Sequence, residues 1–194
     1  MTTPRSDIGR DLARVAVFAA LIVVLGTVTV PLPGGVPITA QTLGVMLAGT
    51  VLGPRRAPLA VLLVLVLAAI GLPVLAGGRG GLGVFVGPTA GYLLGWVAGT
   101  IVIGLIVHRA RITWWRTALG AVVGGILVVY AFGIPVQALV LGVDLAPTAL
   151  SSLVFLPGDL LKAAAATVLT LALVRAYPPA FGKRPVVVAP ARAA

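Results

Sequence analysis

Residues 88–107 read PTAGYLLGWVAGTIVIGLIV and contain no charged side chain. This uninterrupted run is long enough to cross the hydrocarbon core of a bilayer as a helix, which takes about 20 residues. Further apolar runs lie near residues 15–30, 39–53, 58–76, 117–141 and 153–174. The sequence therefore predicts an all-α integral membrane protein built as a bundle of six transmembrane helices.

The composition is that of a protein solvated mainly by lipid. Apolar residues make up 60% of the 194-residue chain and charged residues 9%, whereas soluble domains average roughly 45–50% and 25%. Fourteen Lys and Arg residues face four acidic ones, but they form short clusters between the apolar runs rather than a basic stripe. Such clusters lie against anionic lipid head groups. We therefore expect membrane lipid, and not nucleic acid, among the partners.

The placement of the basic residues predicts the orientation in the membrane. Twelve of the fourteen Lys and Arg residues precede the first run or follow the second, fourth and sixth runs. Arg79 lies in an opposite loop and Lys162 lies inside the last run. By the positive-inside rule, both termini are then cytoplasmic.

The same assignment divides the chain into three parts. We expect a cytoplasmic N-terminal segment at 1–14, a transmembrane domain at 15–175, and a basic, disordered cytoplasmic tail at 176–194. The outer loops are expected near 31–38, 77–88 and 142–152, all rich in Gly and Pro.

Asp159 and Lys162 are ionisable residues within a predicted span, where each charge costs about 2.5–3.5 kcal/mol on insertion scales. They lie three residues apart in LPGDLLK, residues 156–162, in which Pro157 starts the helix. This spacing places both side chains on one helical face. The pair either offers an acceptor and donors to a ligand or forms a structural ion pair between helices.

The stretch AGGRGGLGVFVGPTAGY, residues 76–92, is rich in glycine. It is either a flexible outer connection or a loop that folds over a small ligand. We favour the second interpretation, because Thr89 and Tyr92 then enter the next helix with a hydroxyl and an aromatic wall. Thr39 and Gln41 open the second run in a similar way, although Gln41 is equally suited to an interhelical hydrogen bond.

Other classes of function are disfavoured by what the sequence lacks. The chain has no cysteine and one histidine, so we expect no metal site and no cofactor. A nucleophile, base and oxyanion donors in convergent positions are also missing, which makes an enzyme the least favoured class. No Walker sequence occurs, so any ATP-driven work needs a partner.

Four stretches together resemble the BioY family, the biotin-binding substrate-specificity subunits (S components) of energy-coupling-factor (ECF) vitamin transporters. They are VPITAQTLGVMLAG (36–49), LGPRR (52–56), GGLG leading to GPTAGYL (80–93), and LPGDLLK (156–162). The resemblance implies a six-helix bundle in a bacterial or archaeal cell membrane. It also implies that the protein captures biotin outside and carries it inward with a transmembrane coupling subunit and ATPase subunits.

The resemblance also suggests roles for residues. Asp159 and Lys162 look like the family's polar contacts to biotin, and the loop with Gly80 and Gly81 looks like its ligand-covering segment. Arg79 stands where the family pattern leads us to expect a small polar residue. Biotin suits these groups, because Asp159 can accept from the ureido N–H groups and Lys162 can donate to the ureido carbonyl. Arg79 then holds the carboxylate, or Lys162 does so instead.

Ala16 and Ala20 have the small-x-x-x-small spacing that lets another helix approach closely. This pair either packs within the chain or, as the family resemblance implies, docks on the coupling subunit. The alternative function is a stand-alone secondary transporter or facilitator for another small solute. Such a transporter is expected to carry ion-coupling acids in several spans, whereas this chain has one.

Overall fold

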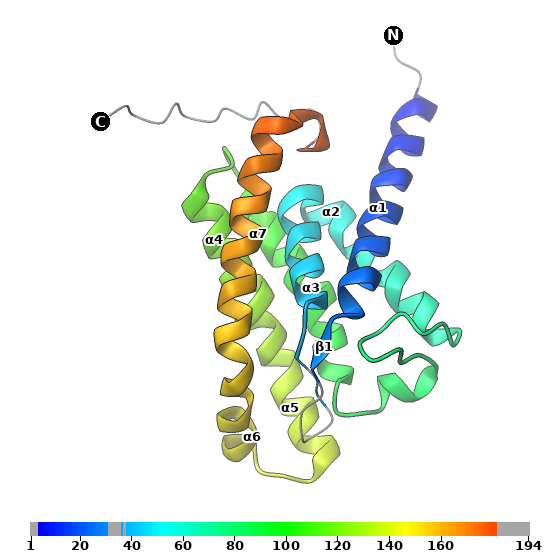
Figure 1. Cartoon of the computed structure of the whole chain (residues 1–194), viewed down its shortest axis with the longest axis vertical. Helices are drawn as coiled ribbons and strands as arrows, with labels where there is room; N and C mark the ends of the chain where they lie inside the picture. The colour runs from blue at the N-terminus through cyan, green and yellow to red at the C-terminus, as the bar shows by residue number, and fades with distance from the viewer. Residues whose placement is uncertain (1–3, 31–35, 37, 182–194) are drawn as a thin grey trace.

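The computed structural model describes residues 4–30, 36 and 38–181, and these residues are mainly helical (Figure 1). In chain order the elements are α1 (Pro4–Gly26), β1 (Thr29–Val30), β2 (Ile38–Thr39), α2 (Gln41–Ala69), η1 (Leu82–Phe85), α3 (Ala90–His108), α4 (Trp114–Val122), η2 (Val123–Val128), α5 (Val129–Leu141), α6 (Leu145–Ser152), η3 (Leu153–Phe155), α7 (Leu156–Ala176) and η4 (Pro178–Phe181). The two short strands pair antiparallel, with Thr29 opposite Thr39.

Four helical stretches within the described residues are long and apolar enough to cross a membrane, namely 41–69, 90–108, 114–141 and 145–176. The prediction of a multi-pass helical membrane protein is thereby confirmed. The predicted runs at 39–53 and 58–76 fall in a single element, α2. The run predicted at 15–30 forms the later part of α1, whose earlier part carries Arg10, Asp11 and Arg14.

Helix α2 consists of two arms that meet at Gly53. The backbone of Gly53 has a φ of 78° and leaves the helical conformation, which glycine tolerates more readily than other residues. Pro54 follows and cannot donate a backbone hydrogen bond. Gly104 of α3 packs directly on this bend, where a Cβ would overlap the backbone at Pro54. The LGPRR stretch therefore turns the chain between the two arms.

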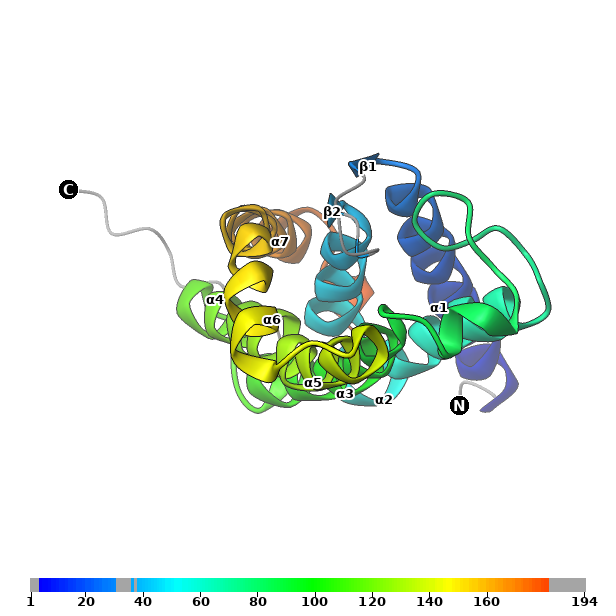
Figure 2. The same ribbon diagram turned by 90° about the horizontal axis from the view of Figure 1, so that it is seen from below.

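The first arm of α2 lies in the middle of the bundle. α1 and α7 flank it in both views (Figures 1 and 2), and α3 packs closely against α2. Where α3 meets the η2 segment, Gly99 and Gly124 face each other so closely that a Cβ on either would overlap the partner's backbone. Small residues of this kind allow membrane helices to approach without a hydrophobic driving force.

The predicted outer loop at 142–152 is wrong for most of its length, because residues 145–152 form α6. Gly142, with a φ of 65°, ends α5. Pro147 lies in the first turn of α6, where a missing N–H costs no helical hydrogen bond. The hydroxyls of Thr148 and Ser152 donate to backbone carbonyls one turn earlier. α6 then continues through η3 into α7.

The chain remains folded for a few residues beyond the predicted start of the tail. Phe181 is buried, and Arg14 of α1 donates to the carbonyl of Pro179 at 2.7 Å. This contact places the start of α1 and the end of α7 at the same end of the bundle (Figure 1). The rest of the predicted tail, residues 182–194, lies outside the described residues.

Candidate ligand-binding site

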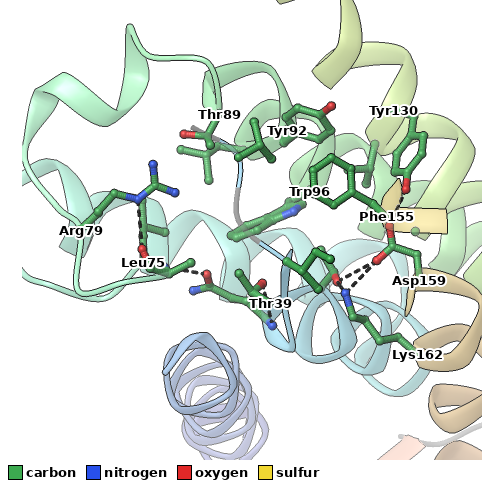
Figure 3. A pocket seen from close by; sticks show the side chains of 18 residues that line it. Thr39, Leu75, Arg79, Thr89, Tyr92, Trp96, Tyr130, Phe155, Asp159 and Lys162 are labelled. Atoms are coloured by element: carbon green, nitrogen blue, oxygen red, sulfur yellow. Dashed lines mark hydrogen bonds and ion pairs between the residues drawn. The ribbon is translucent and has the colours of Figure 1, made fainter. Parts of the chain in front are cut away.

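A cavity lies among the starts of α2, α3 and α7, the η2–α5 segment and the loop that follows α2 (Figure 3). It contains about 670 Å³ of empty space, a figure that includes the open space at its mouth. The lining residues are Val36, Ile38, Thr39, Gln41, Thr42, Leu75, Ala76, Arg79, Thr89, Tyr92, Leu93, Trp96, Gly125, Val129, Tyr130, Phe155, Asp159 and Lys162.

A polar network centred on Asp159 closes one end of the cavity. Lys162 Nζ lies 2.8 Å from Asp159 Oδ1, so the two side chains do share a helical face. The Tyr130 hydroxyl donates to Asp159 Oδ2 at 2.7 Å, and Lys162 also donates to Thr42 Oγ1 at 3.1 Å. These contacts join α2, α5 and α7 at one point (Figure 3).

The network keeps hydrogen-bonding capacity for a ligand. The Lys162 ammonium has three N–H donors. Within the described residues two of them donate to Asp159 and Thr42, so one donor remains. The Asp159 carboxylate has about four lone-pair positions, and its two short hydrogen bonds come from Lys162 and Tyr130. This end of the cavity thus offers a donor and an acceptor side by side.

Arg79 lies at the other end of the cavity, across from the Asp159 network (Figure 3). Its Nε donates to the carbonyl of Ala76 at 3.0 Å, and its backbone pairs with that of Leu75 in an isolated bridge. The loop is thus folded back on itself, which fixes the start of the arginine side chain. Among the described residues no carboxylate pairs with its guanidinium.

Aromatic side chains form the wall between the two charged ends. Trp96 lies in the middle of the cavity (Figure 3); it is 6% exposed, and its indole Nε1 has no hydrogen-bond partner within the described part of the chain. Tyr92 and Tyr130 pack edge to face with ring centroids 6.4 Å apart. A buried N–H without a partner costs free energy. Because the Trp96 N–H is already removed from water, it can donate to a ligand without a further desolvation cost.

Gln41 holds the loop that follows α2. It is fully buried; its Nε2 donates to the carbonyl of Val74 at 3.0 Å, and its Oε1 accepts from the N–H of Ala76 at 3.2 Å. The backbone N–H of Gln41 in turn donates to Thr39 Oγ1 at 3.1 Å. Gln41 was predicted either to contact a ligand or to form an interhelical hydrogen bond. It does form structural hydrogen bonds, but to the loop after α2 rather than to another helix.

The family model that matches this sequence is described as the BioY family and covers residues 1–179. The chain belongs to the BioY family. A "Biotin transporter BioY" of Rhizobium etli is 49% identical over 179 residues, which cover 87% of this chain and 95% of that protein. Another, of Rhodobacter capsulatus, is 54% identical over 166 residues, which cover 79% and 87%. The resemblance drawn from the four sequence stretches is thereby confirmed.

A solved structure agrees with this assignment. The crystal structure of an "S-component for biotin from an ECF-type ABC transporter" matches with a TM-score of 0.82 and 32% sequence identity. The match covers 90% of this chain and 95% of that one. The helical arrangement around the cavity is therefore that of an ECF S component.

Two glycines that we predicted to contact a ligand are absent from the cavity lining. Gly80 packs against the backbone of Leu72, where a Cβ would overlap the carbonyl oxygen. Gly81, with a φ of 83°, donates its N–H to the carbonyl of Ala68 at 2.7 Å. Both glycines fasten the loop to the end of α2, and the loop reaches the cavity through Leu75, Ala76 and Arg79.

Thr89 and Tyr92, predicted to give the cavity a hydroxyl and an aromatic wall, lie at the start of α3 and differ in their surroundings. Tyr92 lines the cavity with its ring, but its hydroxyl points away and donates to Gln137 Oε1 of α5 at 2.7 Å. Thr89, at the N-cap position of α3, is 8% exposed and lines the cavity. Tyr92 is therefore a wall that links α3 to α5, whereas Thr89 faces the ligand space.

Ala16 and Ala20 lie on the exposed face of α1, while Val15 and Ala19 face the bundle. Packing among the described residues therefore does not account for the small-residue spacing. The exposed face is available to lipid or to another helix.

Several cavity residues of this BioY chain were missed from the sequence. Thr42, Trp96, Tyr130 and Phe155 come from different elements and reach the cavity only through the packing of the helices. Gly125 lies in η2, a π-helical turn, and a Cβ there would lie 2.7 Å from the side chain of Met46. Single π-helical turns are frequent at functional sites, but this one has no distinct signal in the sequence.

Proposed function

We propose that this chain captures biotin on the outer side of the cell membrane as the substrate-specificity subunit of an ECF-type, ATP-driven uptake system. The observation that carries the proposal is the two-ended cavity: an Asp159–Lys162 pair at one end, Arg79 at the other, and aromatic walls between them. Biotin has a matching layout, with a polar ureido ring, an apolar thioether ring and chain, and a terminal carboxylate.

The ureido ring fits the Asp159 end. It has two N–H donors and one carbonyl acceptor, and this end supplies a carboxylate acceptor beside the remaining N–H donor of Lys162. Trp96 Nε1, which has no hydrogen-bond partner among residues that the structure describes, is a further donor for a ligand oxygen. Charge-assisted hydrogen bonds in a site shielded from water are the strong ones, so this end supplies most of the affinity.

The carboxylate fits the Arg79 end. Arg79 engages the Ala76 carbonyl through Nε, which leaves the outer edge of the guanidinium for an anion. A planar guanidinium binds a carboxylate through two parallel hydrogen bonds. In this arrangement Lys162 donates to the ureido carbonyl and Arg79 donates to the carboxylate, so the two cations bind different groups of the ligand.

We further propose that six helical segments cross the membrane and that both termini are cytoplasmic. The segments are α1, the two arms of α2, α3, the α4–η2–α5 stretch and the α6–η3–α7 stretch. The Arg14–Pro179 contact supports a common side for the two ends of the bundle. Basic residues of the described chain gather in the segments at that side, which supports its assignment to the cytoplasm. They are Arg10, Arg14, Arg55, Arg56, Arg109, Arg111, Arg116 and Arg175.

Transport also needs partners. The chain has no Walker sequence, so ATP hydrolysis falls to separate ATPase subunits and a transmembrane coupling subunit. The exposed Ala16 and Ala20 on α1 are the docking face that we propose for the coupling subunit.

Uptake of labelled biotin tests this function. Cells that lack their own biotin uptake system should accumulate the label when this chain is produced together with the coupling subunit and ATPases. Cells that produce only the coupling subunit and ATPases are the control. Equal accumulation in both strains would contradict the proposal.

A further inference from the structure

A second hollow opens at the opposite end of the bundle from the ligand cavity. It lies where the bend of α2, the end of α3 and the start of α4 meet, and its empty space, including the open space at its mouth, is about 1,980 Å³. Four arginines line it, Arg55, Arg56, Arg109 and Arg116, and the described lining residues include no acidic side chain. We call this hollow the basic groove.

Little of the positive charge in the basic groove is neutralised by the described residues. Arg56 forms an ion pair with Asp11 at 2.8 Å. Arg116 donates to the carbonyl of Ile106 through Nε at 3.2 Å and Nη2 at 2.9 Å, which orients the guanidinium without cancelling its charge. Arg55 and Arg109 are exposed and have no ion pair within the described chain.

The walls beside these arginines are apolar and exposed. Leu105 is 56% exposed, Leu119 is 46% exposed, and Trp115 is 51% exposed with the Arg116 guanidinium 5.5 Å from its ring centroid. A groove that combines cations with an exposed apolar wall suits an amphiphile better than a small soluble anion, which would leave the apolar wall in water.

The position of the basic groove along the bundle matches a membrane interface. α3 runs from the ligand cavity to the groove over 19 residues, or about 28 Å at 1.5 Å per residue. This length is close to the hydrocarbon thickness of about 30 Å. Trp115 and the arginines therefore lie at head-group depth, where tryptophan and basic residues are enriched.

We propose that the basic groove binds one anionic phospholipid. The phosphodiester lies against Arg55, Arg109 and Arg116, and an acyl chain follows Leu105 and Leu119 toward the bilayer. Basic pockets between membrane helices are the general form of anionic head-group sites. This site is separate from the ligand cavity, so it does not depend on the identity of the transported solute.

Quenching of Trp115 by brominated lipid tests the proposal. The probe is the full-length chain carrying Trp114→Phe. Two tryptophans then remain: Trp115, which is exposed in the groove, and Trp96, which is buried at the ligand cavity. The protein is reconstituted into vesicles of dioleoyl phosphatidylcholine that contain rising fractions of brominated phosphatidylglycerol or, separately, brominated phosphatidylcholine. We expect half-maximal quenching at about a tenfold lower fraction of the anionic lipid, since each nearby arginine contributes appreciably to head-group attraction.

Two double variants separate a specific groove from general surface charge. Arg55→Gln with Arg109→Gln should lower the preference for phosphatidylglycerol over phosphatidylcholine by a factor of at least about five. The matched control, Arg111→Gln with Arg175→Gln, removes two exposed arginines outside the groove lining and should preserve the preference.

Four results would overturn the proposal. Equal quenching by the two lipids would show that the groove does not select a head group, and equal losses in both double variants would show only a general surface potential. Full reversal by excess glycerol 3-phosphate would indicate a soluble-anion site. Loss of co-purification with the coupling subunit from the Arg55→Gln, Arg109→Gln variant, with unchanged lipid preference, would assign the groove to a protein partner.

Discussion

Replacing Asp159 with Asn and Lys162 with Met removes both charges of the buried pair at nearly constant side-chain volume. The two side chains are 8% and 16% exposed, so either single replacement leaves a nearly buried charge without its partner, at a cost of about 3–5 kcal/mol. The double variant avoids that cost. The Tyr130 hydroxyl, which donates to Asp159 Oδ2, can donate to the new amide oxygen, so we expect the fold to persist.

The expected loss of affinity follows from the hydrogen bonds that the ligand makes. A hydrogen bond to a charged group contributes about 1.5–3 kcal/mol, and the double variant weakens at least two of them, one to each residue. We therefore expect biotin binding to weaken at least about a hundredfold, which corresponds to roughly 2.7 kcal/mol.

Titration calorimetry with biotin, combined with thermal unfolding in detergent, measures affinity and stability separately. The matched control is Asp144→Asn with Arg111→Met, which makes the same pair of changes at exposed positions outside the cavity and should retain the wild-type affinity. A stable Asp159→Asn, Lys162→Met protein that binds biotin as tightly as wild type would make the pair a structural ion pair and refute the reasoning.

Three further perturbations separate the other roles. Arg79→Ala should weaken biotin more than biotin amide, because only the acid presents a carboxylate; equal losses in competition binding would exclude that contact. Trp96→Phe should weaken biotin about tenfold without lowering the unfolding temperature, because the indole N–H has no partner among the described residues; lower stability with intact affinity would argue for a packing role. Ala16→Leu or Ala20→Leu should leave calorimetric biotin binding intact but reduce co-purification of the coupling subunit, and weaker biotin binding with unchanged assembly would show that this face points inward.

Hydropathy alone located the helices because lipid imposes a simple requirement. A segment in a bilayer must be apolar and must satisfy its own backbone hydrogen bonds, so long apolar runs become helices. The helical region at 145–152 was missed because Gly142 and Pro147 are typical of loops, although both are also compatible with helix boundaries. Boundaries depend on capping and packing more than on hydropathy.

The site was only partly predictable. Asp159 and Lys162 stood out because charges are rare within spans, and their spacing defined the contact that the structure contains. Trp96 and Tyr130 were missed because an aromatic residue in an apolar run has the same local pattern whether it faces lipid, core or cavity. Tyr92 was predicted to be an aromatic wall, and its ring does line the cavity. The hydrogen bond from its hydroxyl to Gln137 was not predicted, because these two residues are distant in sequence.

Binding of biotin to the purified chain tests the central claim most directly. Calorimetric titration without ATP or partner subunits should give a dissociation constant in the nanomolar range or below. The cavity, the Asp159–Lys162 pair and the Trp96 N–H, which has no partner in the described part of the chain, are already in place before the ligand arrives. Saturating biotin that produces neither heat nor displacement of a labelled biotin tracer would contradict the account.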